Sequence, residues 1–224
     1  MLQRKAISPL LGKSLDILMK MKSLEDFRLV GGTALALQIG HRRSIDIDLF
    51  SDKYTVMYNF DSIFREAKEN LKKLGELCLS ELTSTGLICK ITNKEENVNL
   101  DFWKWPNPFI RQPNIEEGIR MAGLDDLAAM KLEAINDRSN YRDYVDLAFL
   151  SDNYSFSQMM NLYTERTLSH DNTRIIKALS NPDDLVMDQQ LHFLTDISEI
   201  KLKEKVDYML FVYTKEKELE KNKK

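Results

Sequence analysis

Asp46 and Asp48 lie one residue apart in the otherwise apolar segment SIDIDLF, residues 44–50. On a β-strand, side chains at positions i and i+2 point to the same face, so the two carboxylates would project together. Neighbouring carboxylates repel each other, and a hard cation such as Mg²⁺ relieves the repulsion because it takes oxygen ligands. The alternative, an edge strand with one solvated polar face, is the more common explanation of such a bare pair.

The segment before this pair suits the binding of phosphate. Gly31, Gly32 and Thr33 separate a short apolar strand, residues 27–30, from a short helix, residues 33–39. Backbone amides at a helix N-terminus attract anions, and the threonine hydroxyl adds a further donor. A phosphate-binding turn followed by a carboxylate pair is the arrangement that nucleotidyl transfer requires.

Further charged residues occur in other parts of the chain. Asp101, in the apolar strand NLDFW, is a candidate third carboxylate. Lys131 and Arg138 are seven residues apart and share a face if their helix is unbroken, and Arg142 would add another turn. Such cations, oriented by Asp143 and Asp146, could hold a triphosphate. The alternative is a solvated helix with routine ion pairs, and the upstream aspartate pair favours the triphosphate.

Two blocks of the sequence resemble a known family. GGTALAL…HRRSIDIDLF is similar to the first motif of the polymerase-β-like nucleotidyltransferases, and more closely to that of the AbiEii/AbiGii-type nucleotidyltransferase toxins. The toxins carry an Arg-x-Ser/Thr-x-Asp-Ile-Asp core, which here runs from Arg42 to Asp48. Their second block is similar to residues 123–150, with Arg142-Asp143 in place of the family's Lys-Asp pair, which keeps the charge but not the reach.

The resemblance and the residues together imply a Mg²⁺-dependent enzyme. It would transfer a nucleoside monophosphate from a nucleoside triphosphate (NTP) to an acceptor hydroxyl and release pyrophosphate. Asp46 and Asp48 would hold the metal, and Asp101 would bind a second metal or help to deprotonate the acceptor. The expected catalytic residues are Asp46, Asp48, Lys131 and Asp146, and the expected nucleotide-binding residues are Gly31, Gly32, Thr33, Arg43, Lys131, Arg138 and Arg142.

The resemblance also implies a biological role. It favours the toxin of a toxin–antitoxin or abortive-infection pair, with the 3′ end of tRNA as the acceptor and a cognate antitoxin as a partner. A small-molecule nucleotidyltransferase of the aminoglycoside-modifying kind is the second hypothesis. A non-catalytic binding partner with the same fold is the third, and the intact Asp46 and Asp48 count against it.

The elements that must position these residues predict an α/β fold. A small mixed sheet with its helices, residues 1–120, would carry the carboxylates, and a helical bundle, residues 121–224, would complete a nucleotide-binding cleft. Ser8-Pro9 predicts a helix start, and the pattern that follows continues to about residue 24. Residues 60–74 read as a helix and residues 76–92 as a hairpin.

Composition limits the remaining possibilities. The 224 residues carry a formal net charge of −3, so any contact with RNA needs a local basic surface. Cys78 and Cys89 are expected to be reduced, and no signal peptide or membrane span is visible, which predicts a cytoplasmic protein without a membrane partner. The chain has no phosphate-binding GxxxxGK[ST] motif, which argues against a P-loop kinase.

Some chemically versatile residues are less informative. The three histidines lack metal-ligand spacing, and His41 either touches substrate or caps the turn before Arg42. Trp103, Lys104 and Trp105 could stack a nucleobase, but aromatic residues that end a strand before prolines more often belong to a core.

Overall fold

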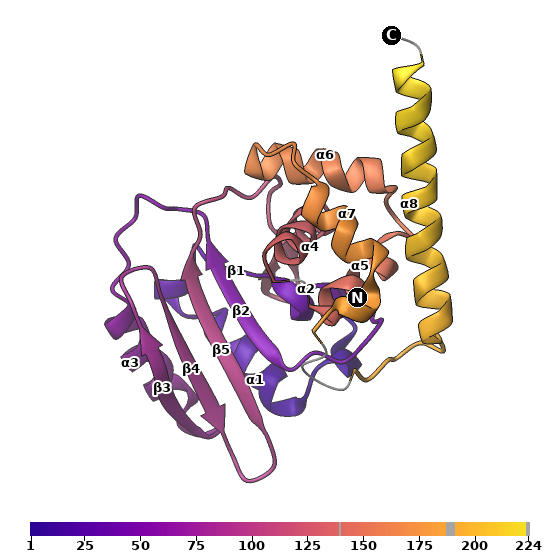
Figure 1. Ribbon diagram of the computed structural model, residues 1–224. Coiled ribbons are helices and arrows are strands. Elements are labelled where there is room, and N and C mark those ends of the chain that lie inside the picture. Colours follow the sequence, from indigo (N-terminus) through magenta and orange to yellow (C-terminus); the bar gives the residue numbers. More distant parts are fainter. Residues whose placement is uncertain (139, 187–190, 223–224) are drawn as a thin grey trace. The chain divides into compact units, whose positions relative to one another are not determined.

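The structure is a computed structural model that describes residues 1–138, 140–186 and 191–222 (Figure 1). Contacts within the chain divide it into two units, Met1–Gly123 and Leu124–Lys224. The first unit is a mixed α/β structure and the second is helical. Both features of the predicted fold class, the mixed sheet and the helical C-terminal part, are confirmed.

Within the described residues, seven strands of the first unit form one mixed sheet in the order β3-β4-β5-β2-β1-β7-β6. Strand β2 pairs with β5 in parallel, and β5 pairs with β4 in the antiparallel sense. The strands are β1 (Arg28–Leu29), β2 (Asp46–Ser51), β3 (Glu76–Leu82), β4 (Gly86–Thr92), β5 (Asn97–Lys104), β6 (Asn114–Glu116) and β7 (Ile119–Met121).

The β6–β7 hairpin was not expected from the sequence. Its strands have three residues each, too few to show a clear alternation of apolar and polar side chains. The turn places both Glu117 and Gly118 at positive φ, the conformation of the tight hairpin turn that matches the twist of the strands.

The helices of the first unit are α1 (Pro9–Leu18), α2 (Gly31–Ile39) and α3 (Phe60–Leu71). Ser8 caps α1 as predicted, because its hydroxyl accepts a hydrogen bond from the Leu11 amide at 3.2 Å. The helix ends at Leu18, earlier than expected, and a separate 3₁₀ turn (Lys22–Leu24) follows. Helix α2 begins at Gly31, so the two glycines form its first turn instead of preceding it.

One face of the central strands is the core of the first unit. Ile47 and Leu49 of β2 and Leu100 and Phe102 of β5 are completely buried. Helices α1 and α3 lie along this side of the sheet (Figure 1). The alternate residues of the same strands point to the other face and are partly exposed. Strand periodicity therefore sends the aspartates to the face opposite the core.

The second unit consists of helices α4 to α8 and a 3₁₀ turn (Pro182–Asp184). In the described part of the chain, no helix is both long enough and apolar enough to cross a membrane. The helices are α4 (Leu124–Arg138), α5 (Tyr141–Leu150), α6 (Phe156–Thr167), α7 (Thr173–Ser180) and α8 (Glu199–Lys221).

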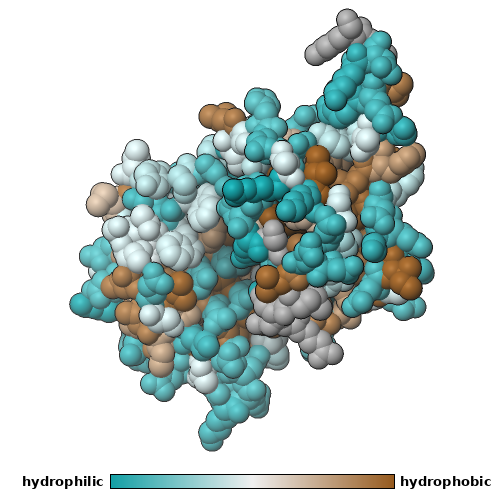
Figure 2. All heavy atoms as spheres, viewed as in Figure 1, coloured by the Kyte–Doolittle hydropathy of each residue, from teal (hydrophilic) through white to brown (hydrophobic). Residues whose placement is uncertain are grey.

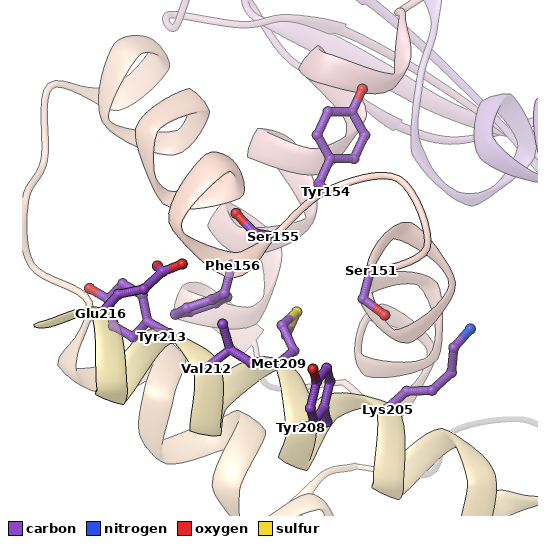
Figure 3. A pocket seen from close by; sticks show the side chains of 10 residues that line it. All are labelled: Ser151, Tyr154, Ser155, Phe156, Lys205, Tyr208, Met209, Val212, Tyr213 and Glu216. Carbon is purple, nitrogen blue, oxygen red and sulfur yellow. The ribbon is translucent and has the colours of Figure 1, made fainter.

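A hollow of about 260 Å³ lies between α8 and the connection from α5 to α6 (Figure 3). Phe156 and Tyr213 meet there edge to face, with ring centroids 4.9 Å apart. None of the residues predicted to act in catalysis or nucleotide binding lines this hollow. The second unit therefore presents a separate aromatic depression whose lining contains no candidate catalytic group.

Candidate active site

The three predicted metal-binding carboxylates lie on one face of two adjacent strands. Asp48 of β2 is paired in register with Asp101 of β5, and Asp46 is paired with Asn99. Side chains of paired residues point to the same side of a sheet, so the three carboxylates share the face opposite the core. The structure thus brings together two residues of one motif and a third that lies far away in the sequence.

Asp101 lies in a strongly perturbing electrostatic environment. Burial, and after it the negative charge of Asp46, raise the pKa of this carboxyl group to about 6. Among the described residues its Oδ1 atom is buried and has no hydrogen-bond partner. A buried acceptor oxygen without a donor is costly, so this position favours either a proton or a cation.

Asn99, which the sequence did not single out, belongs to the same face. Its side-chain amide donates a hydrogen bond of 2.9 Å to Asp46 Oδ1. This bond orients the Asp46 carboxylate. The strand alternation that selected Asp101 also includes Asn99, two residues earlier, and could have identified it.

The chemistry of this face fits a hard dication. Among the described residues, no three histidine, cysteine or acidic side chains already stand in a metal-binding arrangement. The face nevertheless carries three carboxylates, and among the described residues Asp101 Oδ1 is an acceptor without a donor. Oxygen donors of this kind are those that Mg²⁺ prefers.

The Gly31-Gly32 turn lies directly beside Asp48. Gly31 has a φ of +67°, which favours glycine, and a Cβ atom at this position would collide with the Asp48 carboxylate. A Cβ atom at Gly32 would collide with the guanidinium group of Arg42. Both glycines therefore let charged groups approach the start of α2, where the helix N-terminus favours an anion such as phosphate.

The Thr33 hydroxyl has an internal role in the structure. Thr33 is buried, and its Oγ1 lies 2.8 Å from Ser44 Oγ and also contacts the backbone carbonyl oxygen of Asp46. Because a carbonyl oxygen can only accept, Thr33 donates to the Asp46 carbonyl, and its oxygen shares a hydrogen bond with the Ser44 hydroxyl. The sequence suggested a phosphate contact, whereas the structure places this hydroxyl between α2 and β2.

Of the two neighbouring arginines, the structure places Arg42 at the glycine turn. Arg42 is buried, and its Nη1 donates a 3.0 Å hydrogen bond to the carbonyl oxygen of Arg43. Arg43, the residue selected from the sequence, is exposed. Counting back in steps of two from Asp46 through Ser44 leads to Arg42, and this extended-chain pattern is the signal that could have identified it.

The predicted cations and carboxylates of the second unit form a cluster of their own. Lys131 is buried, with its Nζ 2.7 Å from Asp143 Oδ1 and 2.6 Å from Asp146 Oδ2. Arg138 contacts the same Asp143 through Nε at 2.8 Å and Nη2 at 3.1 Å. We refer to Lys131, Arg138, Asp143 and Asp146 as the paired cluster.

The paired cluster changes the pKa of Asp143 in a definite direction. Burial alone raises the pKa of this carboxyl group, but the charge of Lys131 and the hydrogen bond from Arg138 outweigh it and lower the pKa below 3.8. Lys131 and Arg138 lie on the single helix α4, and both contact Asp143.

The expectation that the helix continues through Arg142 was wrong. Helix α4 ends at Arg138, and α5 begins at Tyr141 after Asn140, whose side chain accepts a hydrogen bond from the Arg142 amide. A capping asparagine starts a separate helix, so Arg142 does not continue the helix that carries Lys131 and Arg138.

Solved structures of similar fold include nucleotidyltransferases. JHP933 from Helicobacter pylori aligns with a TM-score of 0.61 at 20% identity, covering 96% of this chain and 95% of that one. MenT4, a nucleotidyltransferase toxin from Mycobacterium tuberculosis H37Rv, aligns with a TM-score of 0.52 at 13% identity, covering 89% and 80%. At these identities the likeness shows the fold alone.

Sequence comparison assigns the family. The family model described as nucleotidyl transferase AbiEii toxin, type IV TA system, matches residues 15–210. The chain therefore belongs to the AbiEii family of nucleotidyltransferase toxins. An uncharacterised protein of Aquifex aeolicus (strain VF5) is 29% identical over 171 residues, covering 75% of this chain and 79% of that protein.

Proposed function

We propose that this nucleotidyltransferase transfers a nucleoside monophosphate from an NTP to the 3′ hydroxyl of a tRNA in a Mg²⁺-dependent reaction. We further propose that it acts as the toxin of a pair with a cognate antitoxin. The observation that supports the chemistry is the alignment of Asp48 with Asp101 beside the Gly31-Gly32 turn. The family supports the toxin role. The tRNA acceptor rests on what the resemblance of the sequence to this family implies.

We assign separate roles in the reaction to residues of the first unit. The backbone amides at the start of α2 and the Arg42 guanidinium hold the phosphates. Mg²⁺ bound by Asp46 and Asp48 would supply charge neutralisation at the phosphate, which is its usual contribution to phosphoryl transfer. Asp101 stands on the neighbouring strand as the acceptor of the hydroxyl proton, and a pKa of about 6 suits this role near neutral pH.

The bond changes balance without a further reactant. The acceptor oxygen forms a bond to the α-phosphorus, the bond from this phosphorus to the bridging oxygen breaks, and pyrophosphate leaves. The proton of the acceptor hydroxyl passes to Asp101. The product is an acceptor extended by one nucleotide through a phosphodiester bond.

In the paired cluster, the ion pair of Lys131 with Asp146 connects α4 to α5. Lys131 already contacts two carboxylates, so a direct contact with the triphosphate requires its ammonium group to exchange one of them for a phosphate oxygen. The Arg138 side chain is 61% exposed and is likewise paired with Asp143.

Incubation of the full chain with Mg²⁺, total tRNA and each labelled NTP in turn tests the proposal. We expect label on tRNA in a denaturing gel with one NTP or a few. Oxidation of the tRNA 3′ end should abolish it, and so should the Asp48→Asn substitution. Label on a small cationic sugar with none on RNA would overturn the tRNA acceptor in favour of a small-molecule nucleotidyltransferase.

A further inference from the structure

The open face of the central strands carries an aromatic position next to the carboxylates. In register, Phe50 of β2, Trp103 of β5 and Gly86 of β4 form one row, and Asp48 and Asp101 lie in the adjacent row. Strands β2, β5 and β4 lie side by side in Figure 1. All of these side chains point to the side opposite the core, where Trp103 and Phe50 remain partly exposed.

Gly86 holds the Trp103 indole flat against the sheet. A Cβ atom at Gly86 would collide with Cε3 of Trp103 and would lie 2.7 Å from its Cδ2. The six-membered part of the indole therefore lies directly over the Gly86 backbone. A glycine on the neighbouring strand thus supports one face of the ring, and the Trp103 side chain as a whole remains partly exposed.

The sequence favoured a core position for Trp103 and Trp105, and the structure differs. Phe102 is the completely buried aromatic residue of this strand, while Trp103 and Trp105 are partly exposed. Trp105 stacks on Phe50 with ring centroids 5.0 Å apart and planes inclined by 21°. A large aromatic ring that stays partly exposed loses part of the free energy that its burial would provide. A flat partner stacked on the ring would recover that free energy.

The position of the ring relative to the carboxylates indicates which partner it meets. The Gly31-Gly32 turn follows β1 and lies on one side of β2, whereas β5 lies on the other side of β2. In the proposed function the phosphates of the NTP bind on the side of the Gly31-Gly32 turn. Asp101, the proposed proton acceptor for the incoming hydroxyl, lies on the side of β5. Trp103 is two residues from Asp101 on the same strand, roughly 6.6 Å along it, a distance comparable to the span of one nucleoside.

We propose that Trp103, supported by Gly86, stacks the terminal unpaired base of the RNA acceptor and so places its 3′ hydroxyl at Asp101. The inference rests on the proposed function, because it assigns a subsite to the acceptor of that reaction. Figure 2 shows small groups of hydrophobic side chains among hydrophilic ones over β3 and β4, the neighbouring part of the sheet. Stacking tolerates any base, so this subsite recognises an unpaired end and not a sequence.

A fluorescence titration tests the subsite without catalysis. The chain has two tryptophans, so Trp105→Phe leaves Trp103 as the only indole and retains an aromatic ring against Phe50. A short single-stranded RNA with a free 3′ hydroxyl, added without NTP, should quench this fluorescence saturably. The same RNA paired to its end in a duplex should not, because its bases are already stacked.

Two outcomes of this titration would overturn the inference. Quenching by NTP and Mg²⁺ but not by RNA would assign Trp103 to the base of the donor nucleotide. Binding of the RNA without a change in Trp103 fluorescence would remove the ring from the acceptor subsite altogether. A matching DNA oligonucleotide shows whether the ribose contributes.

Steady-state kinetics provides the second test. Trp103→Ala should raise the KM for RNA roughly 5- to 150-fold, the range expected for one stacked base, and leave the KM for NTP unchanged. Trp103→Phe should restore most of the affinity. Tyr54→Ala removes another exposed aromatic ring of the first unit and should change neither constant, and thermal unfolding checks that each variant is folded.

The failure of this inference can be distinguished from failure of the proposed function. If the wild-type chain labels RNA and Trp103→Ala has an unchanged KM for RNA, the subsite is wrong and the function stands. If the wild-type chain labels no RNA, the proposed acceptor is wrong, and the fluorescence titration alone then supports or overturns stacking on Trp103.

Discussion

The two units carry charged clusters of opposite electrostatic character. In the first unit, burial and the neighbouring Asp46 raise the pKa of Asp101 to about 6. In the second unit, Asp143 is also buried, yet its pKa is lowered because Lys131 and Arg138 contact it directly. Burial acts in the same direction on both carboxyl groups, so the neighbouring charges decide the difference.

This difference distinguishes two kinds of site. The carboxylate face (Asp46, Asp48 and Asp101) favours an added cation, whereas the charges of the paired cluster already pair with each other. The carboxylate face gathers negative charge and leaves Asp101 Oδ1 without a donor among the described residues, so an added cation is favoured there. The paired cluster balances two carboxylates with two cations. We therefore expect substitutions in the first to change activity with little effect on stability, and substitutions in the second to reduce stability.

The largest effect is expected from a substitution in the carboxylate face. Asp48→Asn preserves the shape of the side chain and removes one metal-binding charge, so transfer activity should fall on the order of 10³-fold or more, about 4 kcal/mol of transition-state stabilisation. Relief of carboxylate repulsion should leave the melting temperature unchanged or slightly higher. Asp61→Asn, a change at a partly exposed carboxylate of α3, is the control. Full activity in the folded Asp48→Asn variant would refute the metal-site proposal.

The next largest effect is expected from a substitution that removes one cation of the paired cluster. Lys131→Met keeps most of the side-chain volume and leaves Asp143 and Asp146 with only Arg138 as a cation of the cluster. Removing one partner of a buried ion pair is costly, and we expect a loss of about 3 kcal/mol in the free energy of unfolding, measured in urea. Lys201→Met on α8 is an exposed control. Unchanged stability with weaker nucleotide binding would instead identify Lys131 as a phosphate ligand.

A smaller effect is the pH dependence of stability, which tests whether the pKa of Asp143 is lowered while that of Asp101 is raised. The folded-state pKa of Asp143 is depressed, so its contribution to stability is present above the ordinary value of 3.8 and is lost as the pH falls through the folded value. Asp143→Asn should cost about 1.5–2 kcal/mol at neutral pH. This difference from wild type should persist down to about pH 5 and should narrow as the pH falls below 3.8 toward the lowered folded-state pKa.

Denaturant unfolding at a series of pH values measures this dependence. Asp152→Asn is a suitable control because it removes an exposed ion pair with Lys205, which contributes little to stability. A gap between wild type and Asp143→Asn that widens on acidification would show that the Asp143 carboxylate is not stabilised by its cations.

The smallest expected effect concerns the neutral hydrogen bonds that hold the carboxylate strand to α2. Thr33→Val removes the hydroxyl that joins Ser44 to the Asp46 carbonyl, and we expect a loss of about 1 kcal/mol in unfolding free energy. Thr33→Ser keeps the hydroxyl and should lose less. If Thr33→Val instead raises the KM for NTP at unchanged stability, the hydroxyl contacts phosphate, as the sequence suggested.

The sequence by itself determined the features that depend on neighbouring residues. Alternation with a period of two placed Asp46 and Asp48 on one face, and the glycine pair indicated a helix start suited to phosphate. The seven-residue spacing of Lys131 and Arg138 held because both lie on the single helix α4. These are local properties, because backbone geometry relates residues a few positions apart in a regular way.

Only the tertiary structure decided which distant residues meet. Asp101 was a candidate from its strand, but its register opposite Asp48 depends on how two segments far apart in the chain align. The same register places Trp103 over Gly86, and a cap at Asn140 interrupts the row that Arg142 was expected to extend. Strand register, and the face of a sheet that helices cover, follow from packing across the whole unit, which spacing along the chain does not encode.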